Sequence, residues 1–172
     1  TAGVVAAVLV ALGFYLIASW LTQEPPNSSI PHWLRWEPPN YSRIEDGLYL
    51  GGSVPEPPPD TQAVLNLCEM PDPYQAAVHR WEPIPDAEPA PGLDWLRRQV
   101  EFIEDQRGAG RTIYVHCRSG VSRGGLVVVA YLMAQHGWSR DQALAFVRIS
   151  RPMVRPNPGF MSRLQEWERS LK

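Results

Sequence analysis

The hydrophobic positions divide the chain into an uncharged beginning and a longer part in which short apolar runs alternate with polar loops. Residues 1–21 contain no charged side chain and show no polar face. As a helix they would be about 31 Å long, close to the ~30 Å hydrocarbon core of a bilayer. The run is longer than the apolar part of a signal peptide, and Trp20 near its end suits the membrane interface. We therefore predict a transmembrane helix rather than a buried core helix or a cleaved signal peptide.

Residues 22–40 are rich in proline and polar residues, which is typical of a linker. Short apolar runs follow it and predict one short strand within 43–52, ended by a glycine turn, and further strands at 63–68, at 78–82 and at 111–117. Helical spacing predicts helices at 94–107, at 124–135, from 140 onward and from 158 to about 171. Because strands dominate early and helices late, residues 41–172 predict one compact α/β domain with a central sheet.

Two of the predicted helices begin with recognisable capping residues. Ser139 and Gln142 have the spacing of a capping box. Asn157 followed by Pro158 is typical of an N-cap with proline at the first helical position.

Charge and cysteine content exclude several classes of function. The net charge is −2 and no stripe of basic residues is present, so nucleic acid is a poor candidate partner. The two cysteines, Cys68 and Cys117, are isolated from one another in sequence. They form neither a disulfide framework nor a zinc motif, and they favour a reducing compartment. We expect no metal and no cofactor.

Residues 115–124, VHCRSGVSRG, connect a predicted strand to a predicted helix. Such a loop leaves N–H groups at the helix N-terminus without intrahelical partners, and the helix dipole favours an anion there. The same donors would favour the thiolate of Cys117, which makes it a nucleophile. Arg123 offers a planar fork for two phosphate oxygens. The alternative is that Cys117 is an inert core thiol and Arg123 a surface charge.

These residues match the HCxxGxxR signature, and the chain resembles the protein tyrosine phosphatase superfamily, in particular its dual-specificity phosphatases. RIEDGLYLGG (43–52), VLNLC (64–68) and RPMVRPNPGFMSRLQEWE (151–168) resemble other segments of that family. The resemblance implies a compact single-domain phosphatase fold, with a central mixed sheet flanked by helices. It implies that Cys117 forms a phosphocysteine and that His116 tunes the thiolate. Arg123 and the loop residues would hold the phosphoryl group; these loop residues are Arg118, Ser119, Gly120, Val121 and Ser122.

The resemblance also implies a general acid, which protonates the leaving oxygen and later deprotonates water. Asp86 aligns with the aspartate that the family uses. Other acidic residues remain alternatives: Glu82, Glu88, Asp72 and Asp94. One departure is Gly124, since the family often has Ser or Thr there to stabilise the departing thiolate. Ser122 or Ser119 could compensate, and the departure bears on turnover more than on phosphate binding.

A cysteine in an N-L-C segment traps the catalytic cysteine as a reversible disulfide in some family members, and residues 66–68 resemble that segment. This gives the hypothesis of a redox brake between Cys68 and Cys117, against the alternative of a packing cysteine. A rhodanese-type sulfurtransferase is a rival enzyme, but its loop typically has four residues between Cys and Arg, whereas five stand here. A phosphate-binding membrane adaptor with little turnover is a rival from another class.

Substrate choice is open between phosphoproteins and a phospholipid. Lipid-directed members of the family that the chain resembles tend to carry extra basic residues in the loop. Arg118 is the only loop cation here besides Arg123, so the resemblance favours phosphoprotein (Tyr/Ser/Thr) substrates over lipid ones. The predicted anchor at 1–21 would hold the site near a bilayer, which favours a phosphoinositide or phosphatidylglycerophosphate. The predicted anchor makes this a single-pass membrane protein, and its catalytic domain is expected to face the cytosol because an oxidising compartment would disable the Cys117 thiolate. The sequence contains no signal for an oligomeric state.

Overall fold

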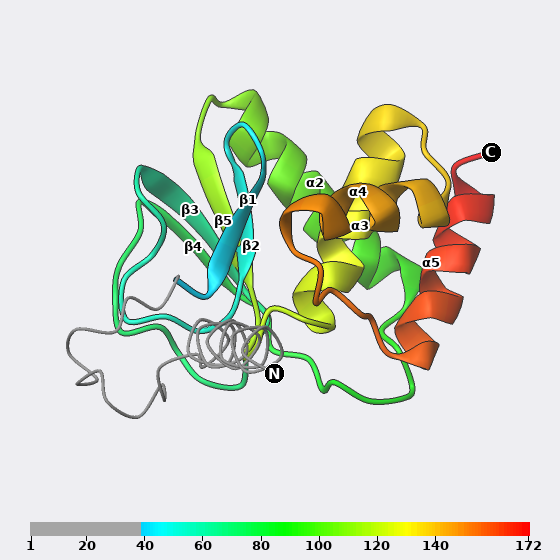
Figure 1. Cartoon of the computed structure of the whole chain (residues 1–172), viewed down its shortest axis with the longest axis horizontal. Coiled ribbons are helices and arrows are strands. Elements are labelled where there is room, and N and C mark those ends of the chain that lie inside the picture. The colour runs from blue at the N-terminus through cyan, green and yellow to red at the C-terminus, as the bar shows by residue number, and fades with distance from the viewer. Residues whose placement is uncertain (1–38) are drawn as a thin grey trace, which may run out of the picture. The chain divides into compact units, whose positions relative to one another are not determined.

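A computed structural model describes residues 39–172, which form one compact unit (Figure 1). The predicted anchor at 1–21 and all but the end of the predicted linker lie outside the described residues. Among the helices of residues 39–172, none is long and apolar enough to cross a membrane.

Five strands form a single mixed sheet with the order β1-β2-β5-β3-β4. Their bounds are β1 Tyr41–Glu45, β2 Leu48–Gly51, β3 Thr61–Asn66, β4 Val78–Trp81 and β5 Thr112–His116. β1 and β2 form an antiparallel hairpin, whereas β2, β5, β3 and β4 are parallel to their neighbours. β3 and β5 end in register, with Asn66 opposite His116, so the residues after these strands meet at one edge. The strands predicted at 63–68, 78–82 and 111–117 are confirmed, whereas the single strand predicted within 43–52 is a hairpin of two strands, β1 and β2, with its turn at Asp46 and Gly47.

Four helices are described: α2 Leu93–Gly108, α3 Arg123–His136, α4 Arg140–Ser150 and α5 Pro158–Ser170. In Figure 1 they all lie to one side of the strands. The capping box at Ser139 and Gln142 is confirmed, with both reciprocal hydrogen bonds present. The N-cap at Asn157 is confirmed too, since its side chain accepts a hydrogen bond from the Phe160 N–H.

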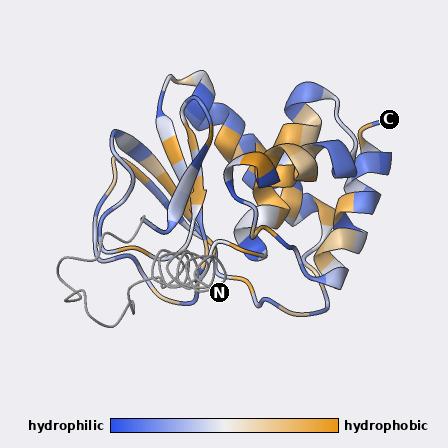
Figure 2. Cartoon of the chain, viewed as in Figure 1, coloured by the Kyte–Doolittle hydropathy of each residue, from blue (hydrophilic) through white to orange (hydrophobic). Residues whose placement is uncertain are grey.

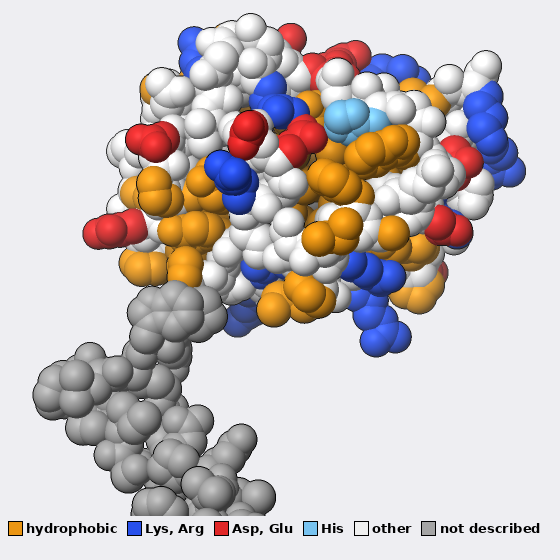
Figure 3. All heavy atoms as spheres, turned by 45° about the horizontal axis from the view of Figure 1, so that its top comes forward, with side chains coloured by type: hydrophobic (Ala, Val, Ile, Leu, Met, Phe, Trp, Pro, Cys, Tyr) orange, Lys and Arg blue, Asp and Glu red, His pale blue; other side chains and the backbone are white. Residues whose placement is uncertain are grey.

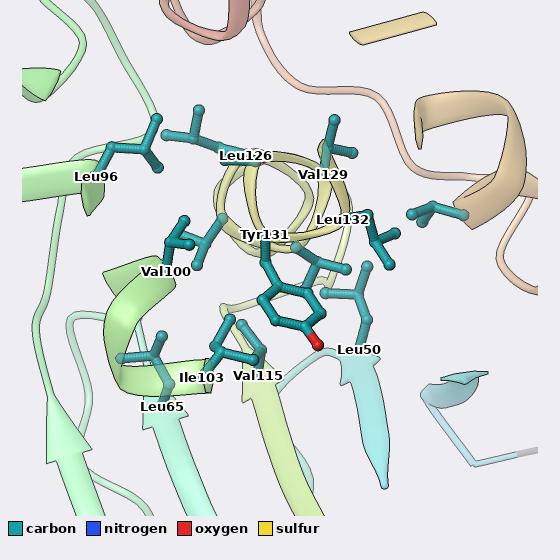
Figure 4. Packing of buried hydrophobic residues seen from close by; sticks show 14 of the residues in the cluster. Leu50, Leu65, Leu96, Val100, Ile103, Val115, Leu126, Val129, Tyr131 and Leu132 are labelled. Carbon is teal, nitrogen blue, oxygen red and sulfur yellow. The ribbon is translucent and has the colours of Figure 1, made fainter. Parts of the chain in front are cut away.

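The core is built around α3, which is buried along almost its whole length. Its apolar residues form the hydrophobic centre of the helical layer (Figure 2). Figure 4 looks along this helix and shows Leu96, Val100 and Ile103 of α2 beside it, with Leu50 and Val115 reaching it from the sheet. A helix packed on all sides cannot shift without disrupting the core, so its first residue, Arg123, has a fixed position. The fold therefore holds the loop before α3 between a central strand and a buried helix.

Candidate active site

The backbone of the loop that joins β5 to α3 is bonded from outside along its entire length. The carbonyl oxygens of residues 118–122 accept hydrogen bonds from, in order, Ser53 N (3.0 Å), Arg151 Nη2 (2.9 Å), Arg151 Nε (2.8 Å), Arg155 N (2.9 Å) and Leu126 N (2.9 Å). Within residues 39–172, none of the N–H groups of residues 118–122 donates to a protein acceptor. Gly120 and Ser122 are buried, and N–H groups without an acceptor are rare in buried backbone. The loop thus presents five N–H groups without protein acceptors, and the hydrogen bonds to its carbonyl oxygens hold it in place.

Gly120 allows the loop to curl tightly. It has a φ of +67°, the left-handed region that glycine adopts without strain. A Cβ at this position would also lie 2.5 Å from the Gly51 carbonyl oxygen of the neighbouring strand β2. Any other residue would therefore both strain the loop and push it away from the sheet.

Cys117 begins the loop and is buried, with 1% of its surface exposed. Its N–H donates to the Gly51 carbonyl oxygen at 3.3 Å, which ties it to β2. The preceding His116 is fully buried and stacks on Tyr114, with ring centroids 5.0 Å apart. The structure therefore places the predicted nucleophile at the loop's origin, and the predicted tuning histidine directly behind it.

Asp72 is the partner of His116, a contact that sequence reasoning missed. Its Oδ2 lies 3.1 Å from His116 Nε2 and 2.9 Å from His79 Nε2, and it accepts from Asn66 Nδ2 at 3.0 Å. Burial alone would raise the pKa of Asp72, but the hydrogen bonds and charges of His116 and His79 lower it below its ordinary value. Asp72, an alternative for the general acid, is thus an ionised structural partner of His116.

Arg123 is buried, and its three hydrogen bonds are all made by Nη1. That nitrogen donates to the carbonyls of Leu67 (3.4 Å) and Ile84 (3.2 Å) and to Glu69 Oε2 (2.9 Å). Nε is buried and has no partner among the described residues. A backbone hydrogen bond within Glu69 and the bond from Arg123 lower the pKa of Glu69 to about 2. The guanidinium is therefore anchored by one end, while its Nε edge is left without a protein acceptor.

Asp86 lies against the far end of the loop. Its Oδ1 accepts hydrogen bonds from Ser122 Oγ (2.6 Å) and Asn157 Nδ2 (2.9 Å), and Ser122 Oγ accepts one from Asn157 N (3.1 Å). Asp86 is the only one of the acidic alternatives with a hydrogen bond to residues 117–123 within the described part of the chain. The structure thus brings together Asp86 and the loop.

Ser122 does not replace the hydroxyl that Gly124 lacks, because its Oγ is already bonded to Asp86. The glycine has a packing reason: a Cβ at Gly124 would lie 2.7 Å from Leu50 Cδ1. A serine there would force this buried leucine of β2 to move.

Cys68 is buried and is a free thiol, as is Cys117. Its Sγ donates to Glu69 Oε2 at 3.2 Å and accepts from Ser53 Oγ at 3.7 Å. Cys68 also lines a cavity of about 420 Å³ together with Met70, Pro71 and Arg118. Cys68 is thus connected to Arg123 through Glu69 and faces the cavity beside the loop.

No three His, Cys, Asp or Glu side chains in residues 39–172 are grouped so that they could bind a metal ion.

Comparison with known proteins identifies the family. The model of the "Dual specificity phosphatase, catalytic domain" family matches residues 61–170. The chain belongs to this family. Dual specificity protein phosphatase 1 of Arabidopsis thaliana is 33% identical over 142 residues, which cover 76% of this chain and 70% of that protein. The crystal structure of a mouse protein complexed with zinc tungstate superposes with a TM-score of 0.73 at 28% identity, covering 80% of this chain and 91% of that one.

Other relatives in the family are much longer than this chain. Protein phosphatase Slingshot homolog 3 of Rattus norvegicus is 47% identical over 83 residues, which make up 48% of this chain but 13% of that protein. The similarity to this longer relative is therefore confined to a small part of it.

Three functional contacts escaped sequence reasoning. Glu69 directly follows the N-L-C segment at the end of β3. Residues that follow neighbouring strands meet at one edge of a sheet, so the sequence contained a signal for the contact between Glu69 and Arg123. Asp72 stands 44 positions before His116, and Arg151 stands 31 positions after Gly120. No local pattern connects residues so far apart.

Asp72→Asn is predicted to reduce the acid sensitivity of the fold. The pKa of Asp72 is lower in the folded state than its ordinary value of 3.8, so its stabilisation is present above that value and is lost as the pH falls through the folded one. We expect the variant to lose about 1–3 kcal/mol of unfolding free energy at pH 7. It should also lose less on acidification than the wild type. Chemical denaturation across the acidic range measures both.

Asp46→Asn is the control for this experiment, because the Asp46 side chain is 93% exposed. If Asp72→Asn follows the acid dependence of the wild type, Asp72 does not hold the ionised role described above.

Proposed function

We propose that the protein hydrolyses phosphomonoesters through a phosphocysteine intermediate. The observation that carries this proposal is the row of free N–H groups at residues 118–122, whose carbonyls are all bonded outward. With the free Nε edge of Arg123, they match the equatorial oxygens of a transferring phosphoryl group. The mouse relative was crystallised with tungstate, a tetrahedral oxyanion, which is consistent with such a site.

The reaction has two steps. The Cys117 thiolate attacks phosphorus, and the S–P bond forms as the bond to the leaving oxygen breaks. Asp86 donates its proton to that oxygen. A water molecule, deprotonated by Asp86, then attacks the phosphocysteine. The S–P bond breaks, inorganic phosphate leaves, and the Cys117 thiolate is restored.

We favour phosphoproteins as the substrate class. Among the described residues, the cavity beside the loop has Arg118 as its only basic lining residue, against two carboxylates, Glu69 and Asp72, while Met70 and two prolines supply apolar surface. One cation opposed by two carboxylates suits a singly phosphorylated side chain better than a polyphosphorylated head group, which would bring more negative charge. A phospholipid, such as a phosphoinositide or phosphatidylglycerophosphate, is the second candidate, because the uncharged run at 1–21 would hold the site at a membrane. We propose a domain that faces the cytosol, where the thiolate stays reduced.

Gly124 favours a second candidate function, a phosphate-binding membrane adaptor. Without a hydroxyl after Arg123, the departing thiolate lacks one stabilising donor, and Ser122 is occupied by Asp86. Such a protein would form a phosphocysteine slowly or hydrolyse it slowly while binding phosphorylated ligands.

The full chain is predicted to release phosphate from p-nitrophenyl phosphate under reducing conditions, and Cys117→Ser is predicted to abolish this release, because serine at this position is not an effective nucleophile. Phosphate release and thermal denaturation would be measured on both proteins. No release by folded, reduced wild type that still binds inorganic phosphate would contradict the phosphatase proposal and favour the adaptor. Phosphopeptide and phospholipid panels then decide the substrate class.

Asp86→Asn is predicted to lower kcat about 10²–10³-fold for an alkyl phosphate, since general acid catalysis contributes roughly this much. The loss should be smaller for p-nitrophenyl phosphate, whose leaving group needs little protonation. Glu88→Gln is the matched control in the same loop, because it also neutralises a carboxylate. A larger loss in Glu88→Gln than in Asp86→Asn would show that the acid is assigned to the wrong residue.

The redox proposal concerns Cys68 and Cys117. Both follow adjacent, in-register strands and both are buried thiols. Hydrogen peroxide would oxidise the pair to a disulfide with formation of water, and a thiol reductant would restore activity. We expect Cys68→Ser to lose this reversibility, since Cys117 then proceeds to sulfinic acid. Mass spectrometry of the non-reduced protein measures it, and a peroxide-induced mobility shift that survives in Cys68→Ser would end the proposal.

A further inference from the structure

Arg151 is a buried arginine whose protein partners are all neutral. It lies at the end of α4 and has 3% of its surface exposed. Its guanidinium donates to the carbonyl oxygens of Gly120 (2.8 Å) and Ser119 (2.9 Å) and to Asn40 Oδ1 (2.6 Å). Tyr114 and Cys117 are the titratable groups that act on its charge within the described residues. A buried cation without a carboxylate partner destabilises the folded state, so we expect the charge of Arg151 to serve the function of the loop.

The first consequence is geometric. Peptide bonds are planar and trans, so the N–H of a peptide points opposite to its C=O. Because Arg151 holds the carbonyls of Ser119 and Gly120, the N–H groups of Gly120 and Val121 are directed away from it. These are two of the five free donors of the loop. Arg151 thus fixes the orientation of both N–H groups before an anion arrives.

The second consequence is electrostatic. Burial lowers the pKa of Arg151, but an arginine remains charged at neutral pH. The charge of Arg123 is partly offset by Glu69 at 2.9 Å, whereas that of Arg151 is not offset by a carboxylate. Arg151 therefore contributes a net positive charge directly behind the loop, in a setting where water screens it weakly.

Asn40 is what keeps this charge uncompensated. Its carbonyl oxygen accepts a hydrogen bond from Gly52 N at 2.8 Å, and a Cβ on Gly52 would collide with the Asn40 amide. Asn40 is an exposed residue, but its amide lies between Gly52, just after β2, and the Arg151 guanidinium. An aspartate has almost the same shape and would keep the bond to Arg151, but it would neutralise the guanidinium.

We propose that Arg151 is a positioning residue that orients the phosphate loop and raises its affinity for dianions, and that a neutral residue at position 40 is required for this effect. The proposal rests on the proposed function, since it concerns the same loop. The affinity of the loop for anions then depends on the residue at position 40, directly before β1.

The experiment measures binding of inorganic phosphate to the full, reduced chain by titration calorimetry, and the rate of Cys117 alkylation by iodoacetate. Asn40→Asp is expected to weaken phosphate binding about tenfold, as one added close charge of opposite sign would. It should also slow alkylation, while its Tm stays equal to or above that of the wild type because an ion pair has been gained. Gln62→Glu adds the same charge at the amino end of β3 and should leave binding within about twofold.

Arg151→Lys separates the effect of the charge at position 151 from the effect of its hydrogen bonds to the loop. As a second variant, it keeps the inference testable if Asn40→Asp fails to fold. Lysine keeps the charge but loses the fork that holds two carbonyls. We expect alkylation close to the wild-type rate with phosphate binding several-fold weaker. Unchanged phosphate affinity in both Asn40→Asp and Arg151→Lys would overturn this inference but leave the proposed function standing. Absence of phosphate binding by the folded, reduced wild type would overturn the inference and the proposed function together.

Discussion

The site depends on one constraint: the carbonyl oxygens of residues 118–122 are all bonded on the outer side of the loop. A backbone segment has one donor and one acceptor per residue, and fixing the acceptors fixes the donors. The bonds come from four different places in the fold, at Ser53, Arg151, Arg155 and the first turn of α3. An anion therefore meets donors that need no reorganisation when it binds, which is the condition under which electrostatic stabilisation is largest.

The rest of the structure serves this arrangement by fixing both ends of the loop. Cys117 is tied to β2 through Gly51, and Arg123 opens a helix that is buried along nearly its whole length. Close approach of the loop to β2 requires Gly120, since a side chain there would meet Gly51. Distances at the site are thus set by the packing of the sheet and α3, and the proposed chemistry would be carried out by three groups attached to that frame: Cys117, Arg123 and Asp86.

Figure 3 shows charged groups of both signs on one face of the molecule. Around the site itself, charge is arranged asymmetrically. Arg123 has a carboxylate partner in Glu69, and His116 has one in Asp72. Arg151, on the outer side of the loop, has the neutral Asn40 instead. Pairing keeps the first two groups in fixed orientations, while the unpaired third leaves net positive charge directly behind the loop that would bind a dianion. Cys68, bonded to Glu69, lies beside this network.

Much of the fold and the centre of the site could be predicted from the sequence because their signals are local. Short apolar runs gave the strands, the caps at Ser139 and Asn157 fixed two helix starts, and Cys117 and Arg123 share one loop. Asp86 was identified by resemblance, and only the tertiary structure places it against Ser122. Glu69, Asp72 and Arg151 act through contacts between separate elements, and chain spacing carries no information on such contacts. The transmembrane helix at 1–21 stays a prediction.

The most direct test of the central claim is an NMR titration of the full chain, in the Cys117→Ser form, with inorganic phosphate. The account predicts that the largest amide chemical-shift changes fall on residues 118–122, as their free N–H groups take up hydrogen bonds to the anion. Saturable binding with the largest changes elsewhere, or no change at these five amides, would contradict it.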